Sequence, residues 1–258
     1  MPSVDGLYYF AHEADNFSRP AVILIHGEAG NHLFWPPQVR RLPDQRILSL
    51  DLPGHGKSGG VGHQQINDYA EEILKFMGSL KLNHAILAGH SMGAAIALQT
   101  AIRFPKSVVG LALAGGAARF RFPRRIVQTA ASSATFAEAV QMLVESSFGP
   151  DANEKVKEST AGRLREARPA ILSGDLLACE AFDVTDQLSK ISTPTLILCG
   201  AEDKMTPLKD SEFLQKHIAI ARREIIPGAG HMVILEQPDR SAAILDGFLN
   251  GISFQPGK

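Results

Sequence analysis

The sequence predicts an α/β protein with an open, mostly parallel β-sheet that helices cover on both faces. Short apolar runs recur along the chain, and helix-like segments separate them. Several runs are apolar on both faces, as parallel strands between two helical layers are. This alternation is typical of a doubly wound or related open sheet. A length of 258 residues and a hydrophobic content of 45% fit one large domain, or a core domain that carries an insertion.

The expected strands are short and rich in aliphatic residues. Leu7–His12 is expected at an edge of the sheet, antiparallel to its neighbour. The strands of the parallel part are expected at Ala21–Ile25, Arg46–Leu50, His84–Ala88, Val108–Ala114, Thr195–Cys199 and Arg223–Ile226.

The helices expected between these strands are indicated by apolar spacing and by stop signals. Asn67–Leu80 places its apolar side chains on one helical stripe. Ser91–Phe104 follows a glycine turn and stops before Pro105, because a proline disfavours helical backbone at the preceding residue. Asp210–His217 and Arg240–Asn250 have similar patterns.

The stretch 119–190 contains no convincing strand. Four helices are expected within it, at Arg124–Ala131, Phe136–Ser147, Glu154–Ala167 and Ala170–Ala181. No glycine- or serine-rich linker bounds the stretch. We therefore expect a helical cap, residues 119–190, inserted into a single core made of residues 1–118 and 191–258.

The net charge and the cysteines indicate which partners and metal sites are not expected. A net charge of −1 gives no global field that would attract nucleic acid, a membrane surface or a highly charged substrate. We see no signal peptide and no run of about 18 apolar residues. Cys179 and Cys199 lack metal-ligand spacing. We expect a cytoplasmic protein with reduced thiols, a monomer or homodimer, with no nucleic-acid partner and no stable membrane insertion.

The strongest local signal is Gly89-His90-Ser91-Met92-Gly93, between an expected strand and an expected helix. This is the G-x-S-x-G pattern of a nucleophile elbow, in which a strained turn exposes the serine hydroxyl above the sheet. Gly89 and Gly93 are required because a Cβ at either position would collide with the neighbouring strand or helix. The alternative is a glycine turn with an incidental serine, which the strand–turn–helix context disfavours.

A serine nucleophile needs a base, and the base needs a carboxylate that orients it. His231 follows a glycine-containing loop beyond an expected strand, and such loops carry the sites of open α/β sheets. Asp203, just beyond Thr195–Cys199, is the expected acid, and its neighbour Glu202 is the rival. A loop histidine or acid often has no role, but here the elbow requires both groups. The order Ser91, Asp203, His231 fits this interpretation.

Two backbone N–H groups must stabilise the oxygen that becomes negative during acyl transfer. Met92, the residue after the nucleophile, is expected to supply one of them. The loop His26–Gly30 is expected to supply the other, from Glu28 first and Ala29 second. Glu28 would act through its backbone, so its side chain need not take part.

With these residues placed, the chain resembles the α/β-hydrolase superfamily, as a serine esterase or lipase-like member with a helical cap. The matching motifs are HGEAG at His26–Gly30, DLPGHGKS at Asp51–Ser58, GHSMG at Gly89–Gly93, GAEDKMTP at Gly200–Pro207 and GAGH at Gly228–His231. The resemblance implies an eight-stranded, mostly parallel sheet, a cap over the active site, a triad of Ser91, His231 and Asp203, and no cofactor or metal. His55 is interpreted as part of a structural landmark and not as catalytic.

Departures from related families narrow the activity. Haloalkane dehalogenases and epoxide hydrolases carry an aspartate nucleophile, where this chain has Ser91. Many carbon–carbon hydrolases carry tryptophan after the catalytic histidine, where this chain has Met232. We expect a carboxylesterase-type serine hydrolase that cleaves small to medium, mainly apolar esters through an acyl-enzyme. The alternatives are lactone, thioester, amide or carbon–carbon cleavage on the same triad, and a non-enzymatic ligand receptor.

Substrate choice is expected to lie in the cap. Its phenylalanines either line an apolar pocket or pack the cap onto the core; they are Phe120, Phe122, Phe136, Phe148 and Phe182. A basic cluster at the start of the cap is either a solvated helix face or a contact for a substrate carboxylate; it comprises Arg119, Arg121, Arg124 and Arg125.

Overall fold

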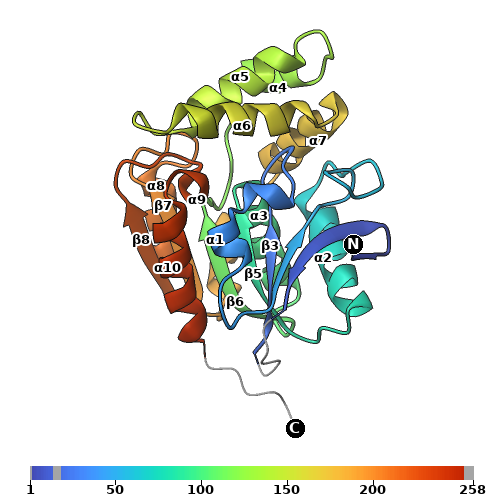
Figure 1. The fold of residues 1–258 in the computed structure, drawn as a ribbon. Helices are drawn as coiled ribbons and strands as arrows, with labels where there is room; N and C mark the ends of the chain where they lie inside the picture. The colour runs from blue at the N-terminus through green and yellow to red at the C-terminus, as the bar shows by residue number, and fades with distance from the viewer. Residues whose placement is uncertain (1, 14–18, 253–258) are drawn as a thin grey trace.

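The computed structural model describes residues 2–13 and 19–252, which fold around an eight-stranded sheet (Figure 1). Along the sheet the strand order is β1-β2-β4-β3-β5-β6-β7-β8. The strands are β1 Ser3–Val4, β2 Leu7–His12, β3 Ala21–Ile25, β4 Ile47–Leu50, β5 Ala85–His90, β6 Val108–Ala114, β7 Thr195–Gly200 and β8 Ala221–Ile226. The pairs β1–β2 and β2–β4 are antiparallel and the others are parallel, as expected of this edge.

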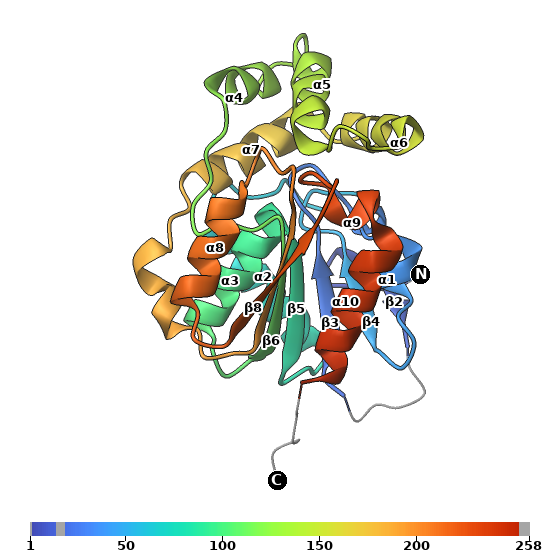
Figure 2. The same ribbon diagram turned by 90° about the vertical axis from the view of Figure 1, so that its left-hand side faces the viewer.

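Helices cover both faces of the sheet (Figure 2). On one face lie α2 Ile66–Ser79, α3 Met92–Arg103 and α8 Leu208–His217, and on the other lie α1 Pro37–Arg40 and α10 Pro238–Asn250. Short helical turns complete the core: η1 His32–Phe34, η2 Thr185–Lys190 and α9 Val233–Glu236. Each expected element is present within two residues of its expected ends, whereas β1 and the short turns were not expected.

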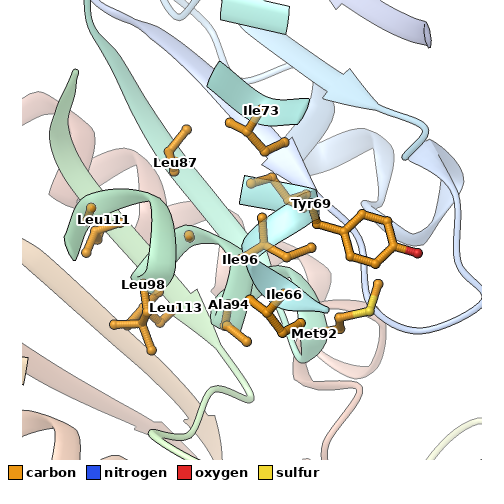
Figure 3. Packing of buried hydrophobic residues seen from close by; sticks show 14 of the residues in the cluster. Ile66, Tyr69, Ile73, Leu87, Met92, Ala94, Ile96, Leu98, Leu111 and Leu113 are labelled. Atoms are coloured by element: carbon orange, nitrogen blue, oxygen red, sulfur yellow. The ribbon is translucent and has the colours of Figure 1, made fainter. Parts of the chain in front are cut away.

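Two apolar clusters fix the sheet between the helical layers. Alternate residues of β3 point to opposite faces, so that Ile23 and Ile25 join one cluster while Val22 and Leu24 join the other. Figure 3 shows the first cluster, in which side chains of α2 and α3, including Tyr69, lie together near β5 and β6. Every residue of β3 is buried, which explains why this strand reads as a continuous apolar run.

The cap lies above the carboxyl ends of the parallel strands (Figures 1 and 2). It consists of α4 Arg124–Ala130, α5 Phe136–Ser147, α6 Glu154–Arg165 and α7 Pro169–Glu180. The two segments that join it to the core run side by side, since Arg119 and Asp183 form an antiparallel bridge and the N–H of Val184 donates to the carbonyl of Ala118 at 2.9 Å. The boundaries at residues 119 and 190 remain a prediction from the sequence.

The five cap phenylalanines are packing residues. Phe136 and Phe148 are buried in a cluster within the cap, and Phe120 and Phe182 are buried in the core cluster under α3. Phe122 packs against both clusters. Of the two sequence interpretations, these contacts favour packing of the cap, and Phe148 also lines a surface cavity. No helix within residues 2–13 and 19–252 has the length and apolar character that a bilayer crossing needs.

Candidate active site

Ser91 lies in a sharp turn between β5 and α3. Its backbone has φ 53° and ψ −116°, in the left-handed region that costs a non-glycine residue energy. The Ser91 N–H donates to the carbonyl oxygen of Ala114 on the neighbouring strand at 2.9 Å. This bond holds the strained turn, and Ser91 immediately precedes α3.

The glycines on either side of Ser91 have no room for a side chain. A Cβ on Gly89 would lie 2.1 Å from the carbonyl oxygen of Gly93. A Cβ on Gly93 would lie 2.2 Å from the carbonyl oxygen of Ile25, at the end of β3. The elbow thus brings the helix against its own strand and against the next strand, and both contacts require glycine.

Three side chains that the sequence places far apart form one hydrogen-bonded chain. The Ser91 hydroxyl lies 2.8 Å from His231 Nε2, and His231 Nδ1 lies 2.9 Å from Asp203 Oδ2. Ser91 has 0% and His231 1% of its surface exposed, so both groups are buried. With Nδ1 donating to Asp203, the unprotonated Nε2 accepts the hydroxyl proton of Ser91.

The loop after β7 presents Asp203 and not Glu202 to the histidine. Asp203 Oδ1 accepts the N–H groups of Met205 and Thr206 at 2.8 and 2.9 Å, and Oδ2 accepts the Thr206 hydroxyl at 2.8 Å. These bonds orient the carboxylate, whereas Glu202 is exposed to solvent. Of the two candidate acids, the structure brings only Asp203 to His231.

Burial and pairing oppose each other at this pair. Burial alone would raise the pKa of Asp203, but the charge of His231 and hydrogen bonds from His231 and Thr206 lower it below its ordinary value. Burial alone would lower the pKa of His231, but the charge and hydrogen bond of Asp203 raise it above 6.5. The acid therefore stays ionised and increases the basicity of the imidazole.

The structure distinguishes between the two candidate N–H groups of the loop His26–Gly30. Ala29, with φ 49°, donates its N–H to Asp175 Oδ2 at 2.8 Å, so this donor is already used. The N–H of Glu28 is the loop's other candidate donor, and it interacts with the side-chain carboxyl of the same residue. Met92 opens α3, and its N–H has no partner within that helix. The expectation that Glu28 and Met92 supply the two N–H groups for an oxyanion stays a prediction.

Asp175 in cap helix α7 is the centre of a buried network that the sequence did not reveal. Besides the N–H of Ala29, its carboxylate accepts His55 Nε2 at 2.8 Å and the Tyr69 hydroxyl at 2.7 Å. Burial alone would lower the pKa of His55, but the charge and hydrogen bond of Asp175 raise it. His55 therefore has a structural contact that links the cap to the oxyanion loop. The one sequence signal was an acid in the middle of a mainly apolar helix.

The side chain of Glu28 also reaches the nucleophile, which the sequence analysis did not expect. Glu28 Oε1 lies 3.3 Å from Ser91 Oγ and 3.5 Å from the Cys179 Sγ of α7. Burial raises the pKa of this carboxyl, and its own backbone N–H and the charge of His231 oppose the increase. The available signal was an acidic residue inside the oxyanion loop.

Comparison with known sequences identifies the family of this chain. The model of the alpha/beta hydrolase fold family matches residues 20–238. The chain belongs to the α/β-hydrolase family. It is 29% identical over 243 residues to 3-oxoadipate enol-lactonase 1 of Acinetobacter baylyi, covering 91% of this chain and 90% of that one. It is 27% identical over 244 residues to a pimeloyl-[acyl-carrier protein] methyl ester esterase of Neisseria meningitidis, covering 90% and 94%.

Solved structures show the same fold. An enol-lactonase from Burkholderia xenovorans superposes on this α/β hydrolase with a TM-score of 0.88 at 24% identity, covering 95% of this chain and 96% of that one. The named relatives are hydrolases of lactones and esters, so the chain belongs to a family of hydrolytic enzymes.

Among the described residues of this α/β hydrolase, no three His, Cys, Asp or Glu side chains are grouped as metal ligands.

The basic cluster at the start of the cap divides into two parts. Arg119 and Arg121 line an open cavity of about 570 Å³ together with Lys204 and Lys209 of the core. Arg125 is exposed and pairs with Glu138 of α5 on the cap surface. The contact with a substrate carboxylate therefore stays a hypothesis for Arg119, Arg121 and the exposed Arg124, whereas Arg125 belongs to a solvated helix face in this α/β hydrolase.

Proposed function

We propose that this chain is a serine hydrolase that cleaves small to medium, mainly apolar carboxylic esters through an acyl-enzyme. The observation that carries the proposal is the contact of 2.8 Å between Ser91 Oγ and His231 Nε2 on a strained elbow. A neutral serine hydroxyl is a weak nucleophile, and a base at this distance activates it.

In the proposed mechanism, His231 accepts the proton of Ser91 while Oγ attacks the ester carbonyl carbon. The N–H groups of Met92 and Glu28 stabilise the oxyanion that forms. His231 then protonates the leaving alcohol as the carbon–oxygen bond breaks. In the second half, His231 removes a proton from water, the resulting hydroxide attacks the acyl-enzyme, and Ser91 leaves with the proton held by His231. Asp203 keeps the imidazole in the required tautomer throughout.

The closed surroundings of Ser91 support compact substrates. The nucleophile has no exposed surface, and the cap clusters above it are filled by packed side chains. A substrate must therefore fit beneath the cap after a movement that admits it. Short and medium acyl chains meet this condition more readily than long ones.

The test is turnover of p-nitrophenyl acetate, butyrate, octanoate and palmitate by the wild type, Ser91→Ala and the control Ser133→Ala. We expect Ser91→Ala to lower turnover by about 10⁴-fold or more, by analogy with other triads. Ser133 is exposed in a cap loop, and its variant is expected to match the wild type. Near-normal turnover by Ser91→Ala would contradict the assignment, and fastest cleavage of palmitate would contradict the expected substrate size.

A lactone is the second candidate substrate, because the chain is 29% identical to an enol-lactonase over 91% of its length. A lactone is a cyclic ester, and the same groups would open it while the alcohol stays attached. Comparing kcat/KM for δ-valerolactone and ethyl pentanoate distinguishes the two. Thioesters, amides and carbon–carbon substrates extend the same panel. Ligand binding without turnover of any member would favour the receptor interpretation.

A further inference from the structure

We infer that the Glu28 side chain is a specificity-determining group that selects esters with an ammonium or hydroxyl group on the carbon next to the scissile carbonyl. The inference rests on the proposed ester hydrolysis and names the substrate class for that same site. It assigns the side chain a role distinct from that of the Glu28 backbone N–H.

The first observation is where the carboxyl lies. Glu28 Oε1 is 3.3 Å from Ser91 Oγ, which also lies 2.8 Å from His231 Nε2. The Cys179 thiol of the cap lies 3.5 Å from the same oxygen. Because Ser91 has no exposed surface, a substrate that reaches Oγ must contact or displace this carboxyl.

The second observation is that, among the described residues, the carboxyl has no Lys or Arg partner. Its donors are its own backbone N–H, the Ser91 hydroxyl, whose proton His231 holds at the shorter distance, and the Cys179 thiol, which is a weak donor. By contrast, Asp175 accepts three strong hydrogen bonds. A carboxylate can accept about four, so Glu28 retains acceptor capacity that faces the nucleophile.

A hydrogen-bond donor on the substrate carbon next to the carbonyl would lie close to the Glu28 carboxyl. Before attack, the carbonyl carbon lies about 3 Å from the nucleophilic oxygen. A substituent on the adjacent carbon is two bonds further on. A carboxyl 3.3 Å from Oγ therefore lies within hydrogen-bond reach of this substituent, and an ammonium group gives the stronger, charge-assisted bond.

The charge of the Glu28 carboxyl determines which esters react faster. Burial raises the pKa of Glu28, and a substrate ammonium group opposes this by stabilising the ionised carboxylate. Without such a donor, an ionised carboxyl repels the forming oxyanion and slows attack on the ester. A substrate ammonium group neutralises the carboxylate and removes this repulsion. A hydroxyl group satisfies the acceptor without neutralising it, so its effect is smaller and has the same sign.

The experiment compares three methyl esters of similar shape: alanine methyl ester, methyl lactate and methyl propionate. Acid release at pH 7 gives kcat/KM for the wild type, Glu28→Gln and the control Glu202→Gln. The wild type is expected to prefer the esters in that order, with alanine methyl ester about 10- to 100-fold above methyl propionate, as hydrogen bonds to charged groups typically allow. Glu28→Gln should lower kcat/KM for alanine methyl ester and raise it for methyl propionate. Glu202 is exposed, and its variant should keep the wild-type ratio.

Each other outcome overturns the inference. Equal decreases for all three esters in Glu28→Gln would mean that the side chain only supports its loop. A wild type without the preference would refute the role of Glu28 and leave the proposed ester hydrolysis intact. The same conclusion would follow if the wild type cleaved p-nitrophenyl esters through Ser91 but none of these three esters. Failure to cleave any ester, p-nitrophenyl esters included, would refute the proposed function, and the inference with it.

Discussion

Replacing Asp175 by alanine tests whether the cap stabilises the oxyanion loop. The buried carboxylate accepts hydrogen bonds from Ala29, His55 and Tyr69 at 2.7–2.8 Å, and the substitution leaves all three donors without this acceptor. Each unsatisfied buried donor costs about 1–3 kcal/mol, and breaking a buried ion pair costs about 3–5 kcal/mol. Since local relaxation recovers part of the sum, we expect the free energy of unfolding to fall by about 3–5 kcal/mol.

The same substitution should slow catalysis. Ala29 follows Glu28 directly, so losing the bond to Asp175 frees the loop that carries the Glu28 N–H, the proposed oxyanion donor. Loss of one oxyanion donor costs about 10²–10³-fold in kcat, which sets the upper limit of the expected effect. Asp175→Asn keeps one acceptor oxygen and should fall between alanine and the wild type.

Urea unfolding followed by circular dichroism measures the stability, and p-nitrophenyl acetate turnover measures kcat on the fraction that remains folded. Glu180→Ala is the matched control, because Glu180 is an exposed acid on the same helix, α7. The reasoning is refuted if Asp175→Ala unfolds within about 0.5 kcal/mol of the wild type, the range of ordinary surface substitutions. Unchanged kcat with reduced stability would refute the coupling to the loop alone.

Three further predictions follow from the site and the core. The acid limb of the kcat/KM profile should have an apparent pKa above 6.5, because Asp203 raises the pKa of His231, and a rate that stays flat down to pH 4 would exclude His231 as base. Gly93→Ala should lower the thermal unfolding midpoint strongly or prevent folding, since its Cβ would lie 2.2 Å from a backbone oxygen; Gly162→Ala, in α6 with open space around it, is the control that should not. The free energy of unfolding should decrease as the pH falls below 6.5, because burial lowers the pKa of His26 to about 4 and of His90 to about 3. These histidines fold in the neutral form, so stability is complete above 6.5 and is lost by up to about 1.4 kcal/mol per pH unit for each, down to their folded pKa values. Urea titrations at pH 7.5, 5.5 and 4.5 measure the slope, and equal stabilities would contradict it.

The sequence revealed those features that local patterns determine. Continuous apolar runs identified strands buried on both faces, and the glycines around Ser91 identified a turn with two forbidden Cβ contacts. His231 and Asp203 were recognisable because both follow strand ends, where the loops of parallel strands converge. The two-residue strand β1 was too short to produce a pattern.

The remaining features depend on contacts between distant residues. Spacing could not distinguish Asp203 from Glu202, because the hydrogen bonds within their loop decide which side chain faces His231. The choice between Glu28 and Ala29 depends on Asp175, which lies 146 residues beyond Ala29 in the chain. The approach of the Glu28 carboxyl to Ser91 likewise exists only after the loop and the elbow have packed together.

The two chain segments that connect the cap to the core pair with each other through Arg119 and Asp183. The cap therefore enters and leaves the core at nearly one point, as an insertion into a single hairpin would. Exchange of this segment between relatives, by recombination or by design, leaves every strand connection of the sheet unchanged. A transplanted cap must nevertheless bring its own acceptor for the N–H of Ala29, since that acceptor is Asp175 here. A cap in such chimaeras thus supplies part of the catalytic framework as well as the walls around the substrate.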